Sequence, residues 1–92
     1  MTLITRTESQ SPIAVAESLD TSGLICPLPI YKASIALSRL APGEVLELVC
    51  TDPGSLADVP ALARQGGHEL LGTDQSEGRQ TFWLRKGGGE AR

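Results

Sequence analysis

Two prolines separated by one residue, Pro27 and Pro29, constrain the fold of this chain more than any other feature of its sequence. Proline fits the first turn of a helix, where the N–H groups have no partner within the helix, and breaks a helix further along. The pair therefore predicts a helix start directly after the turn residues Thr21-Ser22-Gly23, where glycine allows a sharp bend. Gly23, Pro27 and Pro29 are thus expected to support the helix start, with Cys26 at or just before it.

The apolar pattern predicts two helices. In the first, apolar residues recur at helical spacing and form one stripe, which is typical of a helix that packs on a core. The stripe consists of Ile30, Ala33, Leu37 and Leu40. Ala41-Pro42-Gly43 ends this helix. The second helix is expected to run from about Val59 to Gly66-Gly67, since Asp58-Val59-Pro60 places a capping residue and a proline at its start.

Four strands complete the predicted order β-α-β-α-β-β. They are expected at Val15 to Asp20, at Glu44 to Cys50, and at His68 to Asp74 and Arg79 to Lys86, which form a hairpin around Glu77-Gly78. This order favours an α/β (α+β) two-layer sandwich, with both helices on one face of a four-stranded mixed sheet. The folded domain is expected over residues 15–86, between a flexible N-terminal segment (1–14) and a flexible glycine-rich tail (87–92).

Size and composition limit the possible functions. A chain of 92 residues with a net charge of −3 is expected to form one small domain without a basic surface for nucleic acid, and no apolar run is long enough to span a membrane. Its chemistry is expected on the surface, with a partner completing the site. Two cysteines without an apolar leader indicate a reducing, cytoplasmic setting. No cofactor or metal is expected, because one histidine and two cysteines are too few for a structural zinc site.

The position of Cys26 favours a reactive thiol. A helix start carries the positive end of the helix dipole, and the N–H groups of Leu28 and Ile30 are free to point toward the sulfur. Because both effects stabilise a thiolate, the pKa of Cys26 is expected to lie moderately below that of an ordinary thiol. The alternative is that Cys26 is a small buried hydrophobic residue that happens to precede a helix.

A series of short motifs resembles the TusA/SirA-like sulfur-carrier family, which is centred on the pattern CPxP. The resemblance begins with Asp20-Thr21-Ser22-Gly23-Leu24-Ile25-Cys26-Pro27-Leu28-Pro29 and covers about residues 16 to 86. It continues through Ile30-Tyr31-Lys32-Ala33, Pro42-Gly43-Glu44, Asp52-Pro53-Gly54, Asp58-Val59-Pro60 and Gly67-His68-Glu69-Leu70-Leu71. The fold of that family is a two-layer α/β sandwich in the order βαβαββ, which agrees with the order predicted from the apolar pattern.

The resemblance implies that Cys26 carries sulfur as a persulfide and that the chain is a sulfurtransferase. A sulfur-donor protein, either a cysteine desulfurase or a rhodanese-like enzyme, would load the outer sulfur. An acceptor protein would remove it for tRNA thiolation, molybdenum-cofactor assembly or sulfur oxidation. Such a carrier can act as a monomer. Ile25 stands where relatives often have a basic residue, and Ser34 stands where some relatives have arginine. Both differences remove positive charge near Cys26. The helix dipole is therefore the main expected stabiliser of the thiolate.

Other residues carry weaker signals. Lys32 and Arg39 share one face of the first helix and are either docking residues for an acidic partner or part of an ordinary solvated face. Asp52 and Asp58 are expected to cap helices, and Asp52, which lies near the cysteine loop in the family, is a third docking candidate. Cys50 is expected in the core, and His68 is expected to be structural or solvated.

Two other classes of function remain open from the sequence. In the first, Cys26 and Cys50 form a reversible disulfide, and the chain is a redox switch. In the second, the chain is a non-catalytic regulatory module that keeps the fold and does not need the cysteine. Restoration of function by Cys26→Ser would favour the second class over both others.

Overall fold

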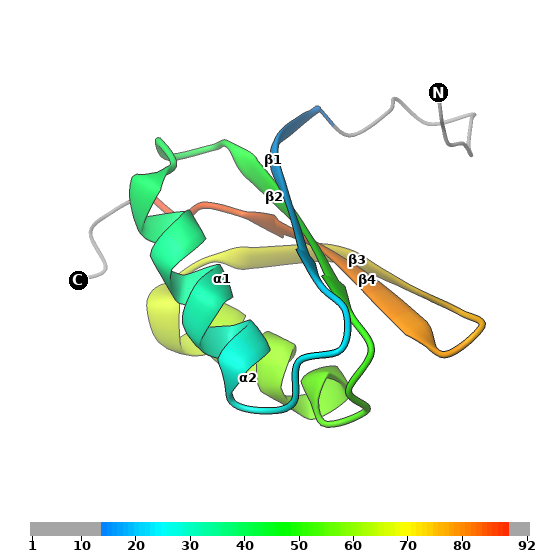
Figure 1. Ribbon diagram of the computed structural model, residues 1–92. Helices are drawn as coiled ribbons and strands as arrows, with labels where there is room; N and C mark the ends of the chain where they lie inside the picture. The colour runs from blue at the N-terminus through cyan, green and yellow to red at the C-terminus, as the bar shows by residue number, and fades with distance from the viewer. Residues whose placement is uncertain (1–13, 89–92) are drawn as a thin grey trace.

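Four strands form one mixed sheet in the computed structural model, which describes residues 14–88. In chain order they are β1 (Val15–Thr21), β2 (Val45–Cys50), β3 (Glu69–Ser76) and β4 (Arg79–Arg85). Their spatial order is β1-β2-β4-β3; β1 runs parallel to β2, and the other neighbours are antiparallel. Both helices, α1 (Leu28–Arg39) and α2 (Ser55–Gly66), cover the same face of the sheet (Figure 1). The predicted two-layer sandwich and its element order are therefore confirmed.

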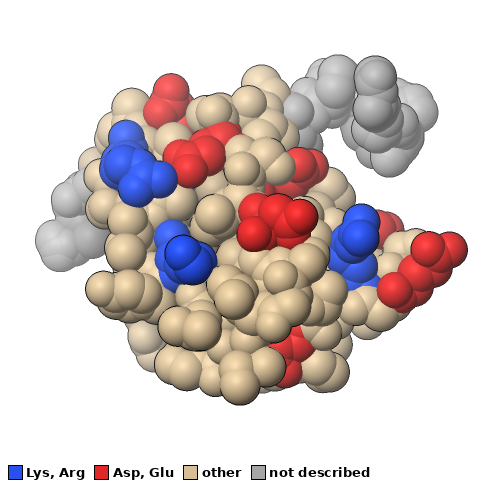
Figure 2. All heavy atoms as spheres, viewed as in Figure 1, with Lys and Arg blue, Asp and Glu red and all other residues tan. Residues whose placement is uncertain are grey.

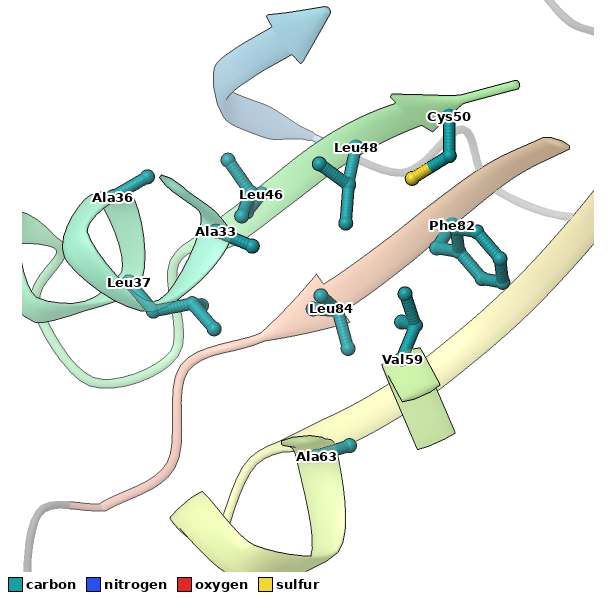
Figure 3. Close-up of a cluster of buried hydrophobic side chains, with 10 residues drawn as sticks. All are labelled: Ala33, Ala36, Leu37, Leu46, Leu48, Cys50, Val59, Ala63, Phe82 and Leu84. Atoms are coloured by element: carbon teal, nitrogen blue, oxygen red, sulfur yellow. The ribbon is translucent and has the colours of Figure 1, made fainter. Parts of the chain in front are cut away.

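The core lies between this sheet face and the two helices. The predicted stripe of α1 points into it: Ala33 and Leu37 are buried, while Ile30 and Leu40 are partly buried against the core. The core cluster combines small helix residues with large strand residues (Figure 3). Its members are Ala33, Ala36, Leu37, Leu46, Leu48, Cys50, Val59, Ala63, Phe82 and Leu84. Small alanines on the helices allow the helix backbones to approach the sheet closely.

The other face of the sheet carries no helix among the described residues. Trp83 points to this face, while its neighbour Phe82 is buried in the core, as expected from strand alternation. The indole Nε1 of Trp83 donates a hydrogen bond of 3.1 Å to Glu47 on the adjacent strand β2. Ser18 on β1 donates a second one of 2.9 Å to the same carboxylate. Glu47 therefore links three neighbouring strands on the open face.

The start of α2 differs from the prediction. The helix begins at Ser55 rather than at about Val59, and Pro60 lies inside it. The reason is the preceding turn, in which the N–H of Ser55 donates to the carbonyl of Asp52 at 3.0 Å and so begins the helix before the proline is reached. Pro60 then removes one helical hydrogen bond, while Val59 and Ala63 remain buried on the inner face. The strand ends differ from the predicted ones by one or two residues.

Segments 1–13 and 89–92 lie outside the described residues. They include most of the N-terminal segment (1–14) and of the tail (87–92) for which flexibility is predicted, so that prediction remains open. Within residues 14–88, no helix is long and apolar enough to cross a membrane.

His68 connects the residues that follow β4 with the C-terminal end of α2 through hydrogen bonds. Gly67 ends α2 in the left-handed conformation, with φ of 74°, and the N–H of His68 then donates to the carbonyl of Ala63 at 2.8 Å. The Nδ1 of His68 accepts a hydrogen bond of 3.0 Å from the N–H of Gly87. Burial lowers the pKa of His68, and the positive charge of Lys86 lowers it further. The histidine is therefore structural, and its neutral form makes the contact.

Acid is expected to weaken this contact. A histidine whose pKa is lowered by folding stabilises the protein above its unfolded pKa, near 6.5, and this stabilisation is lost as the pH falls. The wild-type protein should therefore lose stability to urea between about pH 7.5 and about pH 5. His68→Asn offers a neutral acceptor oxygen at a similar position and should lose less over the same range. An identical pH dependence in both proteins would contradict the role of His68.

Candidate functional site

Cys26 lies in the loop between β1 and α1, one residue before Pro27, which is the N-cap of α1. Its thiol is free and exposed. Pro29 is buried in the first turn of α1, and Gly23 has a φ of +84°, a conformation that favours glycine. The Cys26–Pro27 peptide bond is cis. Gly23, Pro27 and Pro29 thus occupy the positions predicted for them around the start of the helix.

Asp52 fixes the backbone of this loop from the opposite side of the site. It follows β2, and its Oδ2 accepts a hydrogen bond of 2.6 Å from the N–H of Cys26. Its Oδ1 accepts one of 3.2 Å from the N–H of Gly54, the N-cap of α2. One carboxylate therefore ties the cysteine loop to the beginning of α2. These contacts give Asp52 a positioning role, and its docking role stays a prediction.

Asp58 contacts the thiol itself. The Sγ of Cys26 donates a hydrogen bond to Oδ2 of Asp58. Asp58 lies within α2, four positions into the helix, and the N-cap of that helix is Gly54, which has no side-chain cap. The prediction that Asp58 caps a helix is therefore wrong, because α2 starts earlier than predicted. Its side chain is free to reach the cysteine.

The pKa of Cys26 is raised above its ordinary value. The main cause is the hydrogen bond to Asp58, since ionisation would remove the proton that Cys26 donates. Partial loss of water and the negative charges of Asp58 and Asp52 raise the pKa further. The expected lowering by the helix dipole is therefore wrong. The N–H of Leu28 donates to the carbonyl of Ile25 at 2.9 Å, so it is not free for the sulfur, and a nearby full charge outweighs the partial charge of a helix end.

An open groove of about 320 Å³ runs beside the thiol, between α1 and α2. Cys26 and Asp58 line it together with apolar residues of both helices and one polar residue, Gln65. The groove extends from the start of α1, at Pro27 and Ile30, along α2 from Asp58 to Gln65. The groove is open to solvent along its length, so a group bound there stays accessible from outside.

Exposed apolar side chains surround this end of the molecule. Ile25 is 70% exposed and Tyr31 is 65% exposed, and Leu28 and Leu56 are also exposed. The exposure of Leu28, Tyr31 and Leu56 was not predicted from the sequence. The signal was available for two of them, because Leu28 and Tyr31 lie off the apolar stripe of α1. Exposed apolar residues next to a reactive group are typical of a surface that docks with another protein.

The remaining candidates lie apart from the thiol or are engaged elsewhere. Cys50 is fully buried, and Thr21 donates a hydrogen bond to its sulfur at 3.5 Å, so the prediction of a core cysteine is confirmed. Arg39, at the far end of α1, forms an ion pair of 3.1 Å with Glu17. Lys32 and Ser34 are exposed on α1. On the face of the molecule that Figure 2 shows, lysine and arginine side chains are scattered among acidic side chains and form no continuous basic patch.

Comparisons with known proteins match the region that contains this site. The family model of the sulfurtransferase TusA matches residues 17–86. The sulfur carrier protein TusA of Allochromatium vinosum is 43% identical over 70 residues, which cover 76% of this chain and 92% of that protein. The protein of the same name from Pseudomonas entomophila is 39% identical over 69 residues, which cover 75% of this chain and 86% of that protein.

A solved structure shares the fold. The crystal structure of a SirA-like protein from Desulfitobacterium hafniense matches with a TM-score of 0.69 and 22% identity, over 77% of this chain and 97% of that chain. The sequence matches include the cysteine loop, both aspartates and both helices that form the groove. The resemblance predicted from the short motifs is therefore confirmed, and the chain belongs to the TusA family of sulfur carriers.

Proposed function

We propose that Cys26 accepts sulfane sulfur as a persulfide from a donor protein and passes it to an acceptor protein. The observation that carries this proposal is the exposure of the Cys26 thiol at the rim of an open groove, within the segment that matches the family. The second cysteine, Cys50, is fully buried and has no access to a partner. One exposed thiol on a small domain suits a carrier that visits two proteins in turn.

The proposed chemistry needs no cofactor. The sulfur of Cys26 attacks the outer sulfur of a persulfide on the donor, and the inner sulfur of the donor leaves as a thiol. The same exchange in the opposite sense transfers the outer sulfur to the acceptor. The chain is in this sense a sulfurtransferase. A cysteine desulfurase or a rhodanese-like protein is the proposed donor, and the proposed acceptors belong to tRNA thiolation, molybdenum-cofactor assembly or sulfur oxidation.

The surface around Cys26 supports docking through apolar contacts. Ile25 and Tyr31 are the most exposed large hydrophobic residues of the described chain, and both lie within five positions of Cys26. Lys32 is the basic residue of α1 nearest to the cysteine in sequence and remains a docking candidate. Arg39 is less suitable, because Glu17 already pairs with its charge. Ile25 thus adds apolar contact where relatives often carry a base.

Sulfur loading tests the proposal directly. The reduced protein is incubated with a cysteine desulfurase and cysteine, or with a rhodanese and thiosulfate, and its mass is then measured. The wild-type protein should gain the mass of sulfur on the peptide that contains Cys26, and a reductant should remove it. The Cys26→Ala variant should gain none.

The matched control is Cys50→Ala, which removes the buried thiol and leaves Cys26 unchanged. This variant should load as the wild-type protein does, provided that circular dichroism shows it folded. Sulfur found on Cys50 instead of Cys26 would overturn the site assignment. A reversible disulfide between the two cysteines is disfavoured, because it would require the exposed Cys26 to reach a sulfur inside the core, and a disulfide needs Cβ atoms within about 4.5 Å of each other.

A further inference from the structure

The contact between Cys26 and Asp58 has properties that a carrier site does not require. Asp58 comes from the other helix, and its carboxylate accepts the S–H proton of Cys26. The residue is half-buried, and its side chain lines the groove together with the thiol. An anion held beside an exposed thiol keeps that thiol protonated, which is the opposite of activation by a nearby cation.

We propose that Asp58 is a latch for the unloaded carrier: it holds Cys26 as a neutral thiol and releases the residue once it carries a persulfide. This inference deepens the proposed function. Its first measurement concerns only the unloaded protein and therefore does not depend on sulfur transfer.

The transfer step is balanced in atoms and electrons. Cys26 forms a bond to the outer sulfur of the donor persulfide, and the S–S bond of the donor breaks. The proton of Cys26 is lost to water, and the inner sulfur of the donor takes up one proton and leaves as a thiol. One S–S bond forms and one breaks, so neither an oxidant nor a reductant is consumed. Asp58 ends the step as the same carboxylate with which it began.

Loading changes the interaction from attraction to repulsion. A persulfide is a stronger acid than the corresponding thiol, so the loaded residue is an anion and has no proton to donate to Asp58. The charged groups that face Cys26 are Asp58 from α2 and Asp52 from the loop before it. None of the described residues that line the groove is a lysine, arginine or histidine. The loaded sulfur is therefore repelled by two carboxylates and turns outward, toward an acceptor.

The unloaded protein tests the latch through alkylation of Cys26 by iodoacetamide, an uncharged reagent. Asp58→Asn keeps the shape of the side chain and removes its charge. Its rate at about pH 7 should exceed that of the wild-type protein about three- to tenfold, and the midpoint of its pH–rate profile should lie lower. Asp58→Glu keeps the charge and should resemble the wild-type protein. Asp74→Asn, which removes the same charge from β3, should leave the rate unchanged.

Alkylation of the loaded protein tests whether Asp58 releases Cys26 once it carries a persulfide. After loading by a donor enzyme, alkylation of the persulfide should proceed at rates within about twofold in the wild-type protein and Asp58→Asn, because the persulfide no longer contacts Asp58. Equal rates for the two unloaded proteins would overturn the latch. An equal acceleration of the unloaded and the loaded forms would overturn the release and leave only a general charge effect. If the wild-type protein cannot be loaded at all, the proposed function fails, and the unloaded measurement still decides whether Asp58 holds the thiol.

Discussion

Replacing Phe82 with alanine is expected to lower the free energy of unfolding by about 3–5 kcal/mol. Phe82 is the largest fully buried side chain of the described residues and is only 1% exposed. It lies on the central strand β4, between Cys50 on β2 and Val59 on α2 (Figure 3). Its loss opens a cavity that three different elements would have to close. Since small domains are stable by only about 5–15 kcal/mol, Phe82→Ala should leave little of the folded protein's stability.

Urea denaturation followed by circular dichroism measures this loss. Trp83→Ala is the matched control, because Trp83 is the next residue of β4 and is only partly buried on the open face. Its loss of stability should be clearly smaller than that of Phe82→Ala. A loss below about 1 kcal/mol for Phe82→Ala would contradict the position of this ring in the core.

Replacing Asp52 with alanine is expected to slow sulfur loading from a donor protein by about 10- to 100-fold. The carboxylate holds the N–H of Cys26 at 2.6 Å and the N–H of Gly54 at 3.2 Å. Without it, the backbone of the loop that carries the sulfur loses its hydrogen bond to this carboxylate, and only the side chain of Cys26 still contacts α2, through Asp58. A displacement of about 1 Å in a reacting atom can cost about 100-fold in rate. This expectation rests on the proposed role of Cys26 in sulfur transfer.

Two comparisons separate positioning from reactivity in this experiment. Iodoacetamide needs no docking, and removal of a negative charge favours the thiolate, so Asp52→Ala should be alkylated at least as fast as the wild-type protein. Asp52→Asn keeps one acceptor oxygen and should load faster than Asp52→Ala. Single-turnover loading with a desulfurase gives the rates. Loading of Asp52→Ala at the wild-type rate would show that the loop keeps its position without this carboxylate.

Most of the fold follows from local patterns. The stripe of α1 and the alternation along β2 and β4 are periodic over enough residues that one interpretation dominates, and the structure confirms both. The hairpin around Glu77-Gly78 is marked by a glycine with φ of 78°, as its position predicts. The start of α2 could not be derived in the same way. Its sequence contains two possible starts, before Ser55 and before Pro60, and the turn in which the N–H of Ser55 donates to the carbonyl of Asp52 selects the first.

The electrostatics of the site could not be read from neighbouring residues. Cys26 and Asp58 are 32 positions apart, and no local pattern around the cysteine indicates which side chain reaches its sulfur. The segment Asp58-Val59-Pro60 was part of the family resemblance, which was the one available signal that the aspartate matters. Because the start of α2 was predicted too late, Asp58 was interpreted as a cap. The pKa of Cys26 was expected to be lowered, whereas Asp58 raises it.

The cysteine motif and the two carboxylates that contact Cys26 come from different parts of the chain. A peptide that ends at Gly43 would include Cys26, both prolines and the complete helix α1. It would lack Asp52, which holds the amide of the cysteine, and Asp58, which holds its proton. Such a fragment would present an ordinary thiol on an unsupported loop. A segment that keeps both contacts must therefore run from the cysteine loop through α1 and β2 into α2.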